Sequence, residues 1–211
     1  MADTTMPRRD YGGRTADQRR AERKERLLDA GFELFGSNGY AVTSIEKLCA
    51  AASVSTRNFY QEFDGREQVL IELHDRITAR AMAAAVEALE AAEDSGLAQR
   101  VGAALRAYLE VTSSDPRWTR IAYVENMGVG KAVEEHRIVW RERLCRFFDA
   151  EGQRVMDRGE APRRELRTVS IAFIGAVNET MRDWESNGRP VPLDEVCAEL
   201  TRILVASVVS G

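Results

Sequence analysis

The chain has 211 residues, of which 44% are hydrophobic and 30% charged, and its formal net charge is −4. This balance is typical of a globular protein with one large core and a smaller satellite domain. No apolar run approaches the roughly 18 residues that a membrane span needs, and no apolar segment follows the basic residues at the N-terminus. We therefore expect a cytoplasmic protein without a membrane partner or a secretory signal.

Cysteine and histidine are too sparse and too scattered to predict a reactive centre. Cys49, Cys145 and Cys197 lie far apart without a C-x-x-C pair, and His74 and His136 are the only histidines. A zinc site needs such residues in close spacing. We expect reduced, mostly buried thiols, no metal site and no cofactor.

The first predicted unit is a flexible basic arm over residues 1–17, because this stretch has almost no apolar residue to bury. A helix is expected from about Gln18, where apolar residues recur at helical spacing as far as Phe35. Gly39 predicts a left-handed end to that helix. Between Met1 and Arg26 the chain carries eight Arg or Lys against five acidic residues, which is a modest electrostatic footprint for nucleic acid.

Two short helices are predicted next. Thr43 and Glu46 have the spacing of a capping box, in which a hydroxyl and a Glu side chain satisfy free backbone N–H groups. That helix is expected to break near Ser53. Ser55 should cap a third helix that runs to about Phe63, and Asp64 should cap the fourth. Three helices within about fifty residues predict a helix-turn-helix DNA-binding domain over residues 18–66.

The remainder, residues 67–211, is predicted to form a second, larger helical domain. No segment alternates with period two for long enough to suggest a sheet, so the predicted fold is all-α with about nine helices. The expected C-terminal helices are a long connector from about Glu67 to Asp94, then 97–113, a short one after Pro116, 131–158, 163–186 and 193–209.

The third helix presents side chains suited to DNA on its predicted outer face. If Phe59 and Phe63 face the core, Arg57 and Gln61 point directly away from it. Arg can hold guanine with two hydrogen bonds, and Asn or Gln can hold adenine in the same way, which includes Asn58 on the flank. A solvated helix face is the alternative interpretation of any one of these residues.

Three hydroxyl residues are candidates for contacts to phosphate. Tyr60 flanks the outer face, and Thr43 and Ser44 lie at a helix start, where the helix dipole favours anions.

The segment TSIEKLCAAASVSTRNFYQEFDGREQVL closely resembles the helix-turn-helix signature of the TetR family. In that signature a Thr opens helix two, Val-Ser opens helix three, and Tyr-x-x-Phe closes it. The preceding LLDAGFELFGSNGY is similar to the family's first helix, so the resemblance covers about residues 27–73. The sequence departs from the family at Ala52, where the turn usually has Gly, at Arg57, where a small residue is common, and at Arg66, where a Lys often touches phosphate. The expected DNA contacts are Thr43, Ser44, Ser55, Thr56, Arg57, Asn58, Tyr60, Gln61 and Arg66.

The resemblance implies a homodimer that binds double-stranded operator DNA and is released from a palindromic operator by a small-molecule effector, as a repressor. It also implies that residues 67–211 form the domain for ligand binding and dimerisation. Two apolar stripes could pair with a copy of themselves in a four-helix interface, although packing within one protomer is the alternative. The stripes are Leu166, Val169, Phe173, Ala176 and Val177 in one helix and Val196, Leu200, Ile203, Leu204 and Val208 in the last.

A pocket for a largely apolar effector is expected among the middle helices, although each candidate could equally be an ordinary core residue. The candidate lining residues are Tyr108, Trp118, Tyr123, Met127, Trp140, Phe147, Phe173, Asn178 and Trp184. Ligand binding there is expected to move the connector that begins near Gly65 and so change the separation of the two recognition helices.

Two other functions remain open at this stage. An all-helical enzyme would need chemistry that the sequence does not supply, because it has no G-x-S-x-G, H-E-x-x-H or Gly-rich phosphate loop. A helical protein-interaction module that does not bind DNA is the second alternative, since residues 1–66 carry eleven basic and ten acidic side chains. Salt-dependent DNA binding would separate the module from a regulator.

Overall fold

The computed structural model describes residues 15–210, and over this range the chain forms helices, turns and loops without a strand. The all-α prediction is confirmed. The helices are α1 (Ala16–Asn38), α2 (Ile45–Ala52), α3 (Thr56–Phe59), α4 (Arg66–Ala91), α5 (Leu97–Ser113), α6 (Pro116–Tyr123), α7 (Lys131–Asp157), α8 (Arg167–Ser186) and α9 (Leu193–Val209). None of these helices is long and apolar enough to cross a membrane.

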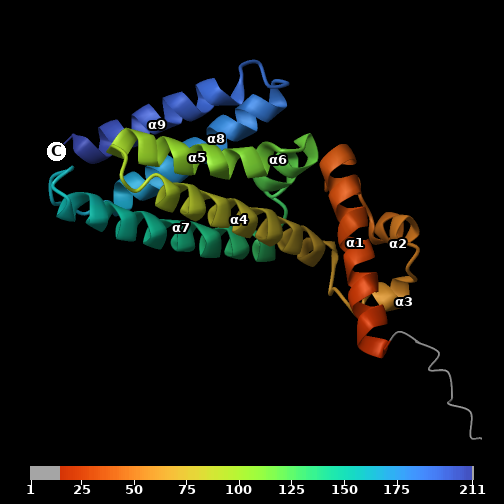
Figure 1. Cartoon of the computed structure of the whole chain (residues 1–211). Helices are drawn as coiled ribbons and strands as arrows, with labels where there is room; N and C mark the ends of the chain where they lie inside the picture. The colour runs from red at the N-terminus through yellow and green to blue at the C-terminus, as the bar shows by residue number, and fades with distance from the viewer. Residues whose placement is uncertain (1–14, 211) are drawn as a thin grey trace, which may run out of the picture.

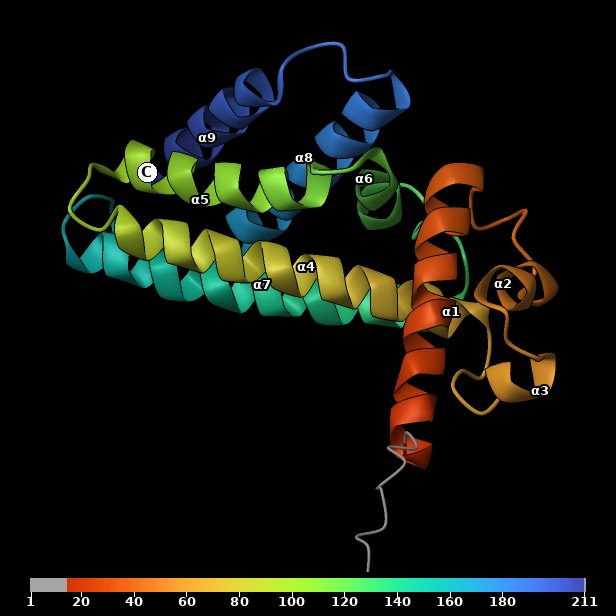
Figure 2. The ribbon, with the colours of Figure 1, turned by 45° about the vertical axis from the view of Figure 1, so that its right-hand side comes forward.

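The helices form a small N-terminal unit and an elongated bundle (Figure 1). Helix α1 stands across one end of the bundle, with α2 and α3 on its far side (Figure 2). Helix α4 leaves this unit and runs along the bundle beside α7, while α5, α8 and α9 complete the bundle. One continuous helix therefore connects the two parts.

The N-terminal core is built from α1, α2, α3 and the first turns of α4. Leu27 and Phe35 of α1 and Phe59 of α3 are fully buried, and Val69 and Leu73 of α4 join the same cluster. The predicted domain boundary at Arg66 coincides with the start of α4, but the packing of the N-terminal unit extends about two turns further along this helix.

Helix α1 begins slightly earlier than predicted. Thr15 caps it, because its hydroxyl accepts from the Gln18 N–H while the Gln18 side chain accepts from the Thr15 N–H. The last residues of the predicted arm, 15–17, therefore belong to this helix and its cap, and residues 1–14 lie outside the described range. The helix ends at Gly39, whose φ of 98° favours glycine.

The predicted Thr43 cap is wrong by one residue. Ser44 is the N-cap of α2 and accepts from the Lys47 N–H, while Thr43 is buried and donates its hydroxyl to the Gly39 carbonyl at 2.8 Å. The Thr43 hydroxyl thus stabilises the loop after α1 instead of capping α2. The break at Ser53 is confirmed, since Ser53 adopts a left-handed conformation with φ 52°.

The third helix is shorter than predicted, and the fourth has a different cap. Ser55 caps α3 by accepting from the Asn58 N–H, but regular α-helix ends at Phe59 and turns continue to Glu62. Gly65, not Asp64, occupies the N-cap of α4 without a side-chain bond. Asp64 is instead held by two reciprocal hydrogen bonds with Gln68.

Most of the predicted dimerisation stripes are core of the single protomer. Phe173 and Val177 of α8 and Leu200 and Leu204 of α9 pack in one cluster with α4 and α5. Ile203 is the exception and is 46% exposed. The start of α8 is also later than predicted, because residues 163–166 lie across α7 and α9 instead of forming a helix turn.

Candidate DNA-binding face and ligand cavity

The residues around α3 form an outward face that no other part of the described chain covers. Phe59 and Phe63 are buried, as predicted, whereas Arg57, Tyr60 and Gln61 are exposed. Within residues 15–210 no hydrogen bond or ion pair engages the Arg57 guanidinium. The predicted outward set is therefore free to meet a ligand, with Ser55 and Thr56 exposed beside it and Asn58 half-buried.

Helix α2 adds polar groups next to this face. Ser44 is half-buried at its N-terminus, and Lys47 is exposed one turn later, with its Nζ donating to the Val42 carbonyl at 2.8 Å. Lys47 was not a predicted contact, although its position three residues after Ser44 on the exposed side was readable from the helical period. Thr43, by contrast, is 1% exposed, so its hydroxyl is not presented to DNA.

The Arg66 guanidinium also forms hydrogen bonds within the chain. Its Nη1 donates to the carbonyls of Tyr40, at 3.0 Å, and Thr43, at 2.6 Å. The guanidinium lies 4.3 Å from the centre of the Tyr40 ring. Arg66 therefore fixes the loop between α1 and α2 against the start of α4, which differs from the predicted phosphate contact.

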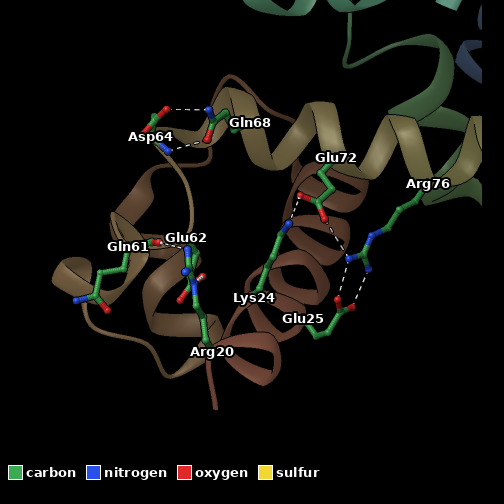
Figure 3. A network of polar contacts seen from close by, with 9 residues as sticks. All are labelled: Arg20, Lys24, Glu25, Gln61, Glu62, Asp64, Gln68, Glu72 and Arg76. Carbon is green, nitrogen blue, oxygen red and sulfur yellow. Dashed lines mark hydrogen bonds and ion pairs between the residues drawn. The ribbon is translucent and has the colours of Figure 1, made fainter. Parts of the chain in front are cut away.

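A buried carboxylate ties the end of the recognition segment to α1. Glu62 is 2% exposed, and its oxygens accept from Arg20 Nε at 2.9 Å and from Arg23 Nη2 at 2.8 Å. Burial alone would raise the pKa of the Glu62 carboxyl, but the two arginine hydrogen bonds outweigh it and hold the pKa below its usual value. Arg20 also donates to the Gln61 carbonyl, while the Gln61 side chain points away from the network (Figure 3).

A second group of ion pairs joins α1 to α4. Arg76 bonds Glu25 through two nitrogens and Glu72 through one, and Lys24 bonds the other oxygen of Glu72 at 2.7 Å (Figure 3). These side chains are more exposed than Glu62. They set the direction in which α4 leaves the N-terminal unit.

The bundle also touches α1 through α6 and the loop after it. Trp118 stacks on Phe32 with ring centres 4.3 Å apart, and the Tyr40 N–H donates to Glu125 at 2.7 Å. A Cβ on Gly36 would lie 2.4 Å from the Arg117 Cβ, so only glycine permits this close approach. The N-terminal unit is therefore seated on two parts of the bundle, α4 and α6.

The bundle contains an apolar chamber with a cavity volume of about 140 Å³. It lies between α4, α5, α7, α8 and α9, and its walls are almost entirely aliphatic and aromatic. Glu151, bonded to Arg154, is the only charged side chain in the lining. Such a chamber suits an elongated apolar molecule.

A more polar vestibule adjoins this chamber. Its walls include His74 and Thr78 of α4, Tyr123 and Asn126 beside α6, and Arg141 of α7. Burial, reinforced by the neighbouring His136 and Arg137, lowers the pKa of His74 to about 3, so this imidazole is neutral. Its Nδ1 lies 3.1 Å from Nε2 of His136.

The structure brings together seven of the nine predicted ligand residues. Tyr108, Phe147, Phe173 and Asn178 line the chamber, and Tyr123, Met127 and Trp140 line the vestibule. The remaining two lie elsewhere. Trp118 packs against α1, and Trp184 donates to the Val191 carbonyl near the α8–α9 turn. Sequence reasoning missed the aliphatic walls, which no local pattern distinguishes from ordinary core.

Residues 27–73 match the family described as bacterial regulatory proteins, tetR family. The match covers the same residues as the resemblance in the sequence. This segment therefore matches the helix-turn-helix region of the TetR family. The chain is a DNA-binding transcriptional regulator.

Similar proteins match nearly the whole length of the chain. It is 23% identical over 195 residues to the HTH-type transcriptional activator FasR of Mycolicibacterium smegmatis, covering 92% of this chain and 87% of FasR. Its fold is similar to that of a putative TetR-family regulator from Syntrophomonas wolfei, with a TM-score of 0.75, 18% identity and coverage of 89% and 95%. It is also similar to FadR from Bacillus subtilis in complex with stearoyl-CoA, with a TM-score of 0.76, 17% identity and coverage of 87% and 98%.

The three departures from the TetR signature have local explanations. Ala52 ends α2 with a buried side chain, and the left-handed turn falls on Ser53 instead. Arg66 reaches backbone carbonyls of the α1–α2 loop. Arg57 is exposed on the outward face. The turn between α2 and α3 is therefore intact.

Proposed function

We propose that this chain binds a palindromic operator as a homodimer and is released when an elongated, largely apolar ligand fills the bundle. The observation that carries the proposal is the course of α4. Its first turns pack in the N-terminal core through Val69 and Leu73, and its later residues His74, Thr78 and Ala85 line the two cavities. A ligand that displaces α4 changes the orientation of the unit that carries Arg57.

The proposed dimer face lies on the outer sides of α8 and α9. Ile171 and Gly175 of α8 and Ile203 and Ala206 of α9 are all exposed. Small and aliphatic residues allow two helices from each protomer to pack closely. A homodimer presents two recognition segments with two-fold symmetry, which is the geometry that a palindromic operator requires.

The ligand class we propose is a long-chain acyl compound. FadR of similar fold is in complex with stearoyl-CoA, and the chamber in this chain is lined almost wholly by apolar side chains. FasR is named an activator. We therefore define the response to the ligand as a loss of operator affinity, and the position of the operator decides whether the bound protein represses or activates. Release then ends either repression or activation.

Selection of bound fragments from random DNA tests the DNA-binding half of this proposal. We expect a palindromic motif whose two halves lie about one helical turn or more apart. Affinity for the selected site should fall steeply with salt, since phosphate contacts release counterions. Failure to enrich any motif, or an affinity independent of salt, would count against operator binding.

A chamber-filling variant tests the ligand-binding half. Ala104 lines the chamber, and A104W is expected to occupy it and remove the effect of palmitoyl-CoA on operator affinity. The matched control is A150W, on the exposed side of α7, which should keep the wild-type response. Fluorescence anisotropy with labelled operator, with and without palmitoyl-CoA, measures both. An unchanged response in A104W would place the ligand elsewhere.

A further inference from the structure

The apolar chamber and the vestibule share four lining residues, Tyr108, Leu144, Ile174 and Asn178. We call these four residues the junction. Two of them have polar side chains, and none is charged. A ligand that extends from the chamber into the vestibule passes the junction. The junction residues therefore contact the boundary between the apolar part and the polar part of the ligand.

The Tyr108 hydroxyl has no hydrogen-bond partner among the residues that the structure describes. Its neighbour Tyr123 differs, because that hydroxyl lies 2.8 Å from Oγ1 of Thr112. Within residues 15–210 the fully enclosed side-chain atoms without a partner are Nε of Arg23 and of Arg164, so the Tyr108 hydroxyl is reachable from the cavity. An unpaired hydroxyl in an apolar wall is unfavourable until an acceptor arrives.

The Asn178 side chain provides a second polar group at the junction. It lies on α8, and within the described chain its amide has no hydrogen-bond partner. Tyr108 lies on α5, so the two donors come from different walls. Each of these groups is a hydrogen-bond donor, and the oxygen of a carbonyl group can accept two hydrogen bonds.

The charges around the junction argue against a carboxylate. Glu134 and Arg137, in the vestibule wall, bond each other at 2.8 Å, and Arg141 is exposed. His74 is held neutral by burial. None of the four junction residues is charged, so a carboxylate there would lose its hydration without a cation in the junction itself, which is costly, whereas a neutral carbonyl accepts hydrogen bonds without that cost.

We propose that the junction recognises the neutral carbonyl of a long-chain acyl thioester, with the Tyr108 hydroxyl donating to the carbonyl oxygen and the Asn178 amide as a second donor. The acyl chain then fills the chamber, and the polar remainder extends through the vestibule towards Arg141. This inference rests on the proposed ligand-binding function. It adds that the site distinguishes a thioester from a free fatty acid.

Calorimetric titration of the full chain with three probes tests this assignment. The probes are palmitoyl-CoA, its thioether analogue S-hexadecyl-CoA, which lacks the carbonyl, and palmitate. Wild type should bind palmitoyl-CoA most tightly. Y108F should weaken palmitoyl-CoA binding roughly tenfold and leave the affinity for the thioether unchanged. N178A should weaken palmitoyl-CoA in the same selective way.

S113A is the control for removal of a hydroxyl from α5, because Ser113 donates to the Leu109 carbonyl and lies outside both cavities. It should keep the wild-type affinities. Y108F should also keep the wild-type melting temperature, since the Tyr108 hydroxyl has no partner to lose within residues 15–210.

The outcomes separate this inference from the function on which it rests. Equal affinity of Y108F and wild type for palmitoyl-CoA overturns the carbonyl contact while the ligand site stands. Palmitate bound as tightly as palmitoyl-CoA also overturns it. If none of the three probes binds or alters operator affinity, the proposed ligand function fails, and the carbonyl site fails with it.

Discussion

The two parts of the chain use polar groups in opposite ways. In the N-terminal unit the polar side chains that tie the recognition segment to α1 are charged and paired, as Glu62 with Arg20 and Arg23. In the bundle the polar groups beside the chamber are neutral except for Glu151, and two of them, Tyr108 and Asn178, have no side-chain hydrogen-bond partner within residues 15–210. The first arrangement holds a surface in one orientation, and the second leaves a site for a ligand to complete.

This contrast follows from what each part must do. A recognition segment of only one helical turn, Thr56–Phe59, cannot hold its own orientation and depends on contacts to α1. In a chamber, on the other hand, the lining side chains lack some of the packing contacts of a filled core, and the space is available to a ligand. The N-terminal unit and the bundle are in contact along α4 and α6. Because the recognition segment is held rigidly, a change in these helices caused by a ligand in the chamber can be transmitted to it.

The strongest test of the rigid side is E62L. It leaves Arg20 and Arg23 without their buried partner, and we expect a loss of about 3 kcal/mol in the free energy of unfolding. Urea denaturation followed by circular dichroism measures the loss. E62Q, which keeps an acceptor oxygen, should lose less. A change below the measurement error in E62L would mean that the recognition segment is held by its apolar contacts alone.

The next effect is expected at the outward face. R57A should cost about 1–3 kcal/mol in operator binding and relax the preference at one base pair if Arg57 reads a base. Competition binding against a panel of single-base operator variants measures this. A uniform loss across the panel would make Arg57 a phosphate contact.

The variant Y60F should be tested against the same panel of single-base operator variants. Tyr60 is 55% exposed, and we expect its hydroxyl to contact a phosphate, so the variant should weaken all sites by a similar factor. A loss confined to particular base pairs would contradict that role.

A smaller effect should appear as a pH dependence of the bundle. His74 has its pKa lowered to about 3 in the folded chain, whereas it gains a proton below about pH 6.5 when unfolded. The unfolded state then binds more protons, so stability falls as the pH drops below that value. Between pH 7.5 and 5.5 wild type should lose about 1 kcal/mol more than H74N, as measured by urea denaturation. Parallel losses would show that His74 is protonated in the folded chain.

The smallest effect is expected for E25L, the counterpart of E62L on the outer surface of the same network. Glu25 is 54% exposed, and Arg76 keeps its bond to Glu72 when Glu25 is removed. Exposed ion pairs contribute little, so the loss of unfolding free energy should stay below about 0.5 kcal/mol. A loss comparable to that of E62L would refute burial as the difference between the two carboxylates.

The outward face could be predicted because it depends on local periodicity. With Phe59 and Phe63 inside, the helical period alone places Arg57 and Gln61 outside. The Thr43 and Arg66 contacts were less predictable. Both residues have suitable chemistry, but their polar atoms are engaged by the loop between Gly39 and Thr43, and no sequence spacing reveals which partner a polar group takes.

The cavity could be predicted only in part. Aromatic candidates such as Tyr108 and Phe147 do line it, but Trp118 and Trp184 have partners in the surrounding packing. A residue in a cavity wall and a residue in a filled core follow the same apolar pattern. Their difference is the absence of an opposing side chain from another helix, which only the assembled bundle decides.

The sequence alone determined the helices, the helix-turn-helix and its family, because caps, turns and the 3.6-residue period act over a few neighbouring residues. Tertiary structure decided which polar groups form hydrogen bonds or ion pairs within the chain and which remain available to a ligand. Glu62 contacts α1 about forty residues away along the chain, and the Tyr108 hydroxyl, where the two cavities join, has no partner in the part of the chain that the structure describes. Such outcomes depend on how distant helices pack, and local propensity carries no information about them.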